Sequence, residues 1–115
     1  MIPAPTSTQL ASPYDWGDGC HGWHLVRAAG LSVSEERMPP GTREVRHWHA
    51  RAVQFFYVLA GTLTLEVEGV VHHLAPRTGI ELPQGTAHQV TNDSAAPVEF
   101  LVVTMPPSRG DRIEA

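Results

Sequence analysis

The chain contains no lysine, because all eight of its basic residues are arginines. Schiff-base chemistry and phosphate binding by a P-loop both require a lysine side chain, so these two function classes are excluded. Eight basic and twelve acidic residues give a net charge of −4, and the arginines form no basic stripe. We therefore expect a small-molecule substrate as the partner, with no nucleic acid and no membrane.

Cysteine and long apolar runs are also scarce. The single cysteine, Cys20, permits no disulfide within the chain, and no segment combines a charged start with a long hydrophobic stretch. Neither secretion nor membrane spanning is indicated, so we expect a cytoplasmic location. Cys20 is expected to be a small buried residue, since no base is identifiable beside it.

The distribution of apolar residues indicates an all-β fold. Short runs rich in Val, Leu, Thr, Phe and Tyr, several with period two, alternate with turns of Gly, Pro or Asn-Asp. The clearest hairpin spans residues 62–74, with Glu68-Gly69 at its turn. About nine short strands in one small domain predict a sandwich or barrel, because a closed sheet leaves no exposed edge. We divide the chain into an N-terminal arm (1–22), a β-barrel (23–105) and a C-terminal tail (106–115).

Histidine is abundant, and three of the seven histidines lie in two groups with defined spacing. The first group is Gly41-x5-His47-x-His49-x4-Gln54-x6-Gly61, and the second is Pro83-x-Gly85-x2-His88-x3-Asn92. A His-x-His alone is expected by chance about 0.4 times in such a chain, whereas the whole first group is expected about once in several thousand chains. The two groups together therefore exceed chance.

Both groups resemble the motifs of the cupin superfamily, and the likeness covers roughly residues 31 to 105. Gln54 stands where the first motif usually has Glu, and Arg77 stands where the second motif begins with Gly. The chain is most similar to small single-domain, RmlC-like cupins. The resemblance implies a cupin-type antiparallel β-barrel, that is, a double-stranded β-helix or jelly roll. It also implies one divalent transition metal ion inside the barrel, bound by His47, His49, Gln54 and His88.

The spacing is physically consistent with such a site. Alternate side chains of a strand share a face, so His47 and His49 are expected on one side, about 6.5 to 7 Å apart along the backbone. Gln54 and His88 come from other strands, and a closed barrel is needed to bring all four together. Imidazole suits Mn, Fe, Zn and Ni alike, so the identity of the metal stays open.

The donor set indicates the class of reaction. Three imidazoles and one amide leave the charge of a divalent ion uncompensated, which strengthens its Lewis acidity and disfavours oxidation to a trivalent state. The pattern with Gln at this position is also similar to that of small cupins that act as lyases, isomerases or cyclases, including hydroxynitrile lyases. We expect a non-redox lyase, isomerase or cyclase that acts on a small carbonyl or hydroxyl compound such as a cyanohydrin or an enol. A non-haem metal dioxygenase and a non-catalytic small-molecule-binding domain are the alternatives.

Two residues are candidates for handling the substrate. If strand parity holds, Arg43 shares the face of His47 and can pair with a substrate carboxylate, although an exposed arginine at a strand end is an equal alternative. His88 or a water molecule is the expected proton shuttle. Large aromatic side chains fall on the outer face of the barrel, which indicates that a second sheet or a second copy covers this face. We expect a homodimer, and an ordinary core role of these side chains is an equal alternative: Trp23, Trp48, Phe55 and Tyr57.

Overall fold

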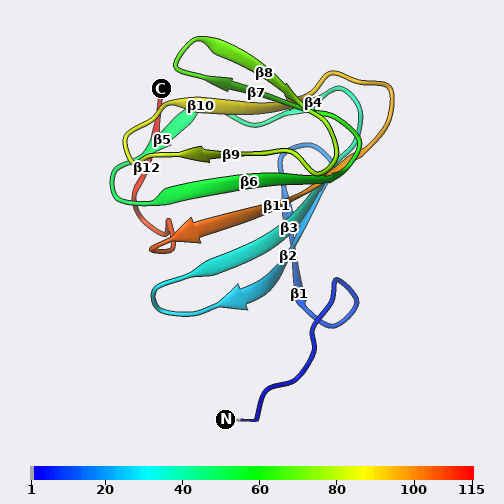
Figure 1. Cartoon of the computed structure of the whole chain (residues 1–115), viewed down its shortest axis with the longest axis vertical. Coiled ribbons are helices and arrows are strands. Elements are labelled where there is room, and N and C mark those ends of the chain that lie inside the picture. Colours follow the sequence, from blue (N-terminus) through cyan, green and yellow to red (C-terminus); the bar gives the residue numbers. More distant parts are fainter. Residues whose placement is uncertain (1) are drawn as a thin grey trace.

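The computed structural model describes residues 2–115, which form twelve β-strands and no helix. The strands form two sheets, and every pairing between them is antiparallel (Figure 1). The first sheet has the order β1 (Ser12–Trp16), β2 (Cys20–Arg27), β3 (Ser32–Met38), β11 (Val98–Met105), β6 (Val53–Ala60) and β9 (Gly79–Leu82). The second has the order β12 (Arg112–Glu114), β5 (His47–His49), β10 (His88–Asn92), β7 (Leu63–Val67) and β8 (Val70–Leu74), with β4 (Thr42–Arg43) beside β10. The predicted all-β jelly roll is confirmed.

Side-chain alternation on two long strands builds the core between the sheets. Phe56 and Val58 on β6 are buried, and so are Phe100 and Val102 on the neighbouring strand β11. Cross-strand pairing places Phe100 opposite Val58 and Val102 opposite Phe56. The rings of Phe56 and Phe100 lie with their centroids 6.2 Å apart, within the range of favourable aromatic pairs. The even-numbered residues of β11 and those of β6 from Gln54 to Val58 therefore face the interior.

The predicted hairpin of residues 62–74 is confirmed. Strands β7 and β8 pair up to Val67 and Val70, which leaves Glu68 and Gly69 as a two-residue turn. Both turn residues have positive φ, 49° and 87°, as a type I′ turn requires. The tight turn sets the register of the hairpin.

Four turn positions of the motifs adopt left-handed backbone: Gly41, Gly61, Arg77 and Gly85. Gly61 has a φ of +81°, and a Cβ at this position would collide with the carbonyl oxygen of Pro97, so only glycine fits. Arg77 has a φ of 66° at the position where the second motif usually has Gly. A residue with a Cβ is strained in that region, so the departure of this chain from the motif has a structural cost.

Strands extend beyond both predicted boundaries of the barrel. Residues 12–16 form β1, which pairs with β2, so part of the predicted arm is an edge strand of the first sheet. Residues 112–114 of the predicted tail form β12, which pairs with β5. These short segments show too few alternating residues to be recognised as strands in the sequence. The pairing of β12 is important for the site, because β5 carries two of the histidines.

Apolar side chains are exposed on the outer side of the first sheet. Phe55 and Leu59 on β6 are 39% and 41% exposed, and Met105 on β11 is 53% exposed. The predicted homodimer would cover such side chains, and it stays a prediction. Within residues 2–115 there is no helix with the length and apolar character needed to cross a membrane, and the cytoplasmic location also stays a prediction.

We predict that Arg77→Gly raises the free energy of unfolding by about 1 kcal/mol, because glycine adopts the left-handed conformation without a steric cost. Urea denaturation followed by tryptophan fluorescence measures the change. Arg77→Ala is the matched control, since it removes the guanidinium but keeps a Cβ, and it should give no gain. Equal gains in both variants would assign the effect to the arginine side chain and contradict the backbone argument.

Candidate metal centre

Three imidazoles from two adjacent strands meet between the sheets. His47 and His49 lie on β5, and His88 on β10 is the cross-strand partner of His47. All three side chains are buried, and one ring nitrogen from each lies within 4.8 Å of the others. Alternation on β5 turns the intervening Trp48 away from this point. The structure therefore brings together the three histidines predicted from the sequence.

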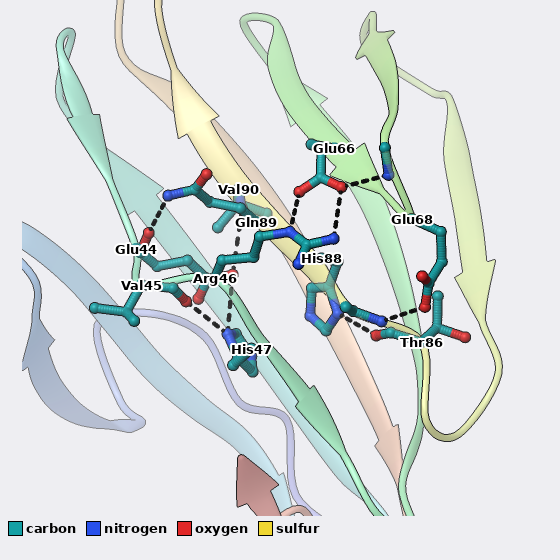
Figure 2. Close-up of polar contacts among 12 residues, drawn as sticks. Glu44, Val45, Arg46, His47, Glu66, Glu68, Thr86, His88, Gln89 and Val90 are labelled. Atoms are coloured by element: carbon teal, nitrogen blue, oxygen red, sulfur yellow. Dashed lines mark hydrogen bonds and ion pairs between the residues drawn. The ribbon is translucent and has the colours of Figure 1, made fainter. Parts of the chain in front are cut away.

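Backbone carbonyls orient two of these rings. Nδ1 of His47 donates a hydrogen bond of 2.8 Å to the carbonyl oxygen of Val45, and Nδ1 of His88 donates one of 2.9 Å to that of Thr86 (Figure 2). A neutral imidazole that carries its proton on Nδ1 has a lone pair on Nε2. Both rings are thus held in the tautomer that presents Nε2 as a metal ligand.

A carboxylate orients the third ring. Nδ1 of His49 donates to Oδ1 of Asp111 at 2.9 Å, while Oδ2 of Asp111 accepts the backbone N–H groups of Arg51 and Ala52 at 3.1 and 2.9 Å. Burial raises the pKa of Asp111, but these three hydrogen bonds outweigh it and hold the pKa below its ordinary value. Asp111 therefore stays ionised. Sequence reasoning missed it because its place depends on the pairing of β12 with β5, which no spacing reveals.

Gln54 is the fourth predicted donor, and it lies buried on β6. Its Nε2 donates to Oγ1 of Thr104 at 3.4 Å, which leaves Oε1 as the free atom of the amide. Among residues 2–115, the buried side-chain atoms without a hydrogen-bond partner are Gln54 Oε1, His49 Nε2 and His88 Nε2. Buried polar atoms are rarely left unpaired, and a divalent cation would satisfy all three. The donor set therefore fits a divalent metal ion.

Burial favours the neutral form of two of the imidazoles, those of His47 and His88. Burial lowers the pKa of His47 to about 4, helped by the positive charge of Arg112 and the neighbouring rings, and opposed by the hydrogen bond to Val45. Burial also lowers the pKa of His88, against the hydrogen bond to Thr86. Neutral imidazole is the form that binds metals, so the lowered pKa values of His47 and His88 favour metal binding.

Two cavities adjoin the donors. The inner one, of about 230 Å³, is lined by Glu36, Glu44, His47, His49, Gln54, Phe56, Val102, Ser108 and Arg112. The outer one, of about 690 Å³, shares Glu36, Gln54, Val102 and Ser108 with it. The inner cavity therefore combines an apolar wall with two carboxyl groups and one guanidinium. Sequence reasoning did not find these charged residues, since it assigned mostly apolar side chains to the interior.

Glu44 is one of these carboxyl groups. Its Oε1 lies 3.8 Å from Nδ1 of His47. Burial and the neighbouring Glu36 raise the pKa of Glu44 to about 8, opposed by Arg112 and the backbone N–H of Val90. Glu44 is thus largely protonated at neutral pH.

The structure does not bring Arg43 to the donors. Arg43 is exposed on β4, opposite Thr91 of β10, and it lines neither of these cavities. Residues 44–46 lie outside the strands, so the alternation assumed from His47 back to Arg43 is interrupted. Glu44, the next residue in the chain, is half-buried and lines the inner cavity. The arginine that lines this cavity is Arg112.

Asn92 of the second motif has a structural role. Its Nδ2 donates to the carbonyl oxygens of Met38 and Ala96 at 2.9 and 2.8 Å. Gly85 of the same motif donates its backbone N–H to the carbonyl oxygen of His49 at 2.8 Å. The motif therefore also connects the loops around β5 and β10, which keeps the histidine-bearing strands in place.

A family model described as "Cupin domain" matches residues 34–104 of the chain. The chain is a cupin. The match extends from β3 to the penultimate residue of β11 and includes all four predicted donors, so the resemblance inferred from the two motifs is confirmed. Asp111 lies outside the matched residues.

Solved structures share the fold of this cupin. The polyketide cyclase RemF from Streptomyces resistomycificus is 18% identical, with a TM-score of 0.87 over 99% of this chain and 86% of that one. TT1209 from Thermus thermophilus is 29% identical, with a TM-score of 0.69 over 72% and 79%. A cupin-superfamily sugar phosphate isomerase from Silicibacter pomeroyi is 23% identical, with a TM-score of 0.80 over 90% and 76%.

We predict that Asp111→Asn weakens binding of a divalent metal by about 10- to 100-fold, because the amide cannot accept all three hydrogen bonds that the carboxylate accepts. Competition with a chromophoric chelator measures the dissociation constant. Asp18→Asn, at an exposed aspartate, is the matched control and should bind as the unmodified protein does. Unchanged affinity in Asp111→Asn would show that His49 needs no such acceptor.

Proposed function

We propose that this cupin is a divalent-metal-dependent, non-redox lyase, isomerase or cyclase that acts on a small carbonyl or hydroxyl compound such as a cyanohydrin or an enol. The observation that carries the proposal is the set of buried donor atoms without a hydrogen-bond partner: Nε2 of His49 and His88 and Oε1 of Gln54. Nε2 of His47 completes the set. These four side chains are the ones that would hold the metal.

When bound, a divalent ion would supply a Lewis acid that polarises a carbonyl or hydroxyl oxygen. The chain's own residues prepare the site for this role. Hydrogen bonds from Nδ1 to Val45, Thr86 and Asp111 hold the imidazoles in one orientation, which limits reorganisation during reaction. Phe56 and Val102 provide an apolar wall for the hydrocarbon part of a substrate.

The charge of the donors favours non-redox chemistry. No carboxylate is among the four donors, and a site without anionic ligands disfavours a trivalent metal. Asp111 contributes its negative charge only through the ring of His49. This distribution favours polarisation of an oxygen over cycling of the metal between oxidation states.

Two structural neighbours support the reaction class. RemF is a polyketide cyclase, and the Silicibacter pomeroyi protein is a sugar phosphate isomerase. A cyclisation and an isomerisation both rearrange bonds within a substrate without net oxidation. The same fold can host unrelated chemistries, so the donor atoms carry more weight than this likeness.

We predict that the purified protein binds about one equivalent of a divalent transition metal per chain and that His49→Ala loses most of it, because one donor and its link to Asp111 are removed. Elemental analysis by plasma mass spectrometry measures the content. His72→Ala removes an imidazole away from the cluster and should retain the metal. Equal metal content in the two variants would contradict the assigned site.

We predict that turnover proceeds at the same rate with and without oxygen. Cyanohydrins, small enols and diketones are incubated with the metal-loaded protein under air and under argon, and the products are followed by NMR. A reaction that needs oxygen and consumes it would identify a dioxygenase instead. Saturable binding of these compounds without turnover would favour a binding domain.

A further inference from the structure

Three residues lie side by side on β1, β2 and β3, the last three strands at one edge of the first sheet. Tyr14 on β1 is opposite Gly22 on β2, and Gly22 is opposite Glu36 on β3. Directly opposed residues of neighbouring strands point to the same face of a sheet. Tyr14 and Glu36 therefore share a face, and the residue between them has no side chain.

The ring of Tyr14 occupies the space above Gly22. A Cβ built on Gly22 would collide with the Cζ and Oη atoms of Tyr14. The ring thereby reaches across β2, and Oη donates a hydrogen bond of 2.6 Å to Oε2 of Glu36. The absence of a side chain at position 22 is thus what permits the contact between Tyr14 and Glu36.

Glu36 lies where the two cavities meet. Its side chain lines both the inner cavity with the metal donors and the larger outer cavity, whereas Tyr14 lines only the outer one. Gln54 lines both cavities as well. A compound that extends from the donors into the outer cavity therefore passes the Glu36 carboxyl group.

We propose that Glu36 is the catalytic base of this cupin, positioned by Tyr14, and that the substrate is an enolisable carbonyl compound whose acidic C–H group lies at the junction of the cavities. This inference rests on the proposed function. Glu36 takes the proton from the carbon next to the carbonyl, the C–H electron pair forms a C=C bond, and the C=O pair moves to oxygen as an enolate. Glu36 then returns the proton to the same carbon, the C=C pair forms the new C–H bond and the oxygen pair restores the C=O bond, so no oxidant or reductant is needed.

The electrostatic surroundings support this role. Burial raises the pKa of Glu36 to about 7, opposed by the hydrogen bond from Tyr14 and the positive charge of Arg112 on β12. The other ionisable groups that act on or respond to Glu36 are Cys20 on β2 and Glu44. A base with a pKa near the working pH is best suited to move a proton in both directions.

The first test measures Glu36 itself, without any substrate. In the metal-free protein with 13C-labelled glutamate, the Glu36 carboxyl resonance should titrate near pH 7. Because the hydroxyl of Tyr14 stabilises the carboxylate, both Tyr14→Phe and Gly22→Ala should move the midpoint to higher pH. Gly30→Ala is the matched control, since a Cβ there meets no atom within 4 Å. A midpoint near 4.5, the ordinary value, or no shift in either variant, would overturn the proposal.

The second test measures proton transfer with hydroxyacetone, a small enolisable ketone, in deuterated water. The zinc-loaded protein should accelerate deuterium incorporation next to the carbonyl, and Glu36→Gln should lower that rate by about 100-fold or more with an unchanged zinc content. In Tyr14→Phe, the pH at which the rate is half-maximal should rise, because deprotonated Glu36 is the active form. Equal rates in Glu36→Gln and the unmodified protein would overturn the inference alone. No acceleration by the unmodified protein would instead contradict the proposed function.

Discussion

The candidate metal centre of this cupin depends on hydrogen bonds that fix three imidazole rings through their Nδ1 atoms. Each Nδ1 is paired with an acceptor, so each Nε2 presents a lone pair to the common point. For His47 and His88 the acceptor is the carbonyl two residues earlier, and each histidine is the first residue of its strand. The turn that leads into the strand therefore also orients the ligand. The conformation of these two short loops therefore fixes the orientation of His47 and His88.

Much of this centre could be predicted from the sequence. The His-x-His spacing needs only the period-two geometry of a strand, and the short strand β5 preserves it. Gln54 and His88 were found through the cupin motifs, whose glycines mark turns that the backbone enforces, as at Gly61. Local patterns of this kind survive in the sequence because they depend on neighbours along the chain. The fold class followed from the same local alternation and turn signals.

Several of the residues that sequence reasoning missed depend on contacts between distant segments. Asp111 lies 62 residues after His49 in the sequence, and it reaches His49 because β12 pairs with β5. Tyr14 reaches Glu36 only because three strands are in register. The prediction that Arg43 faces the donors assumed that side chains alternate without a break from His47 back to Arg43. The strand is interrupted at residues 44–46, so this alternation does not hold. Tertiary packing sets the register between strands and the points where a strand is interrupted, and a single sequence does not show this packing.

The three acceptors behind the rings are not equivalent in how they can change. Two of them are main-chain carbonyls, which every amino acid carries, so no point substitution can delete them. The third is the side chain of Asp111, and replacement at that one position alters how strongly His49 donates electron density to a bound cation. The electronic character of the centre is thus adjustable at a single ligand while the other two stay constant. The residues that related cupins carry at this position would show how often this property of the ligand differs between them.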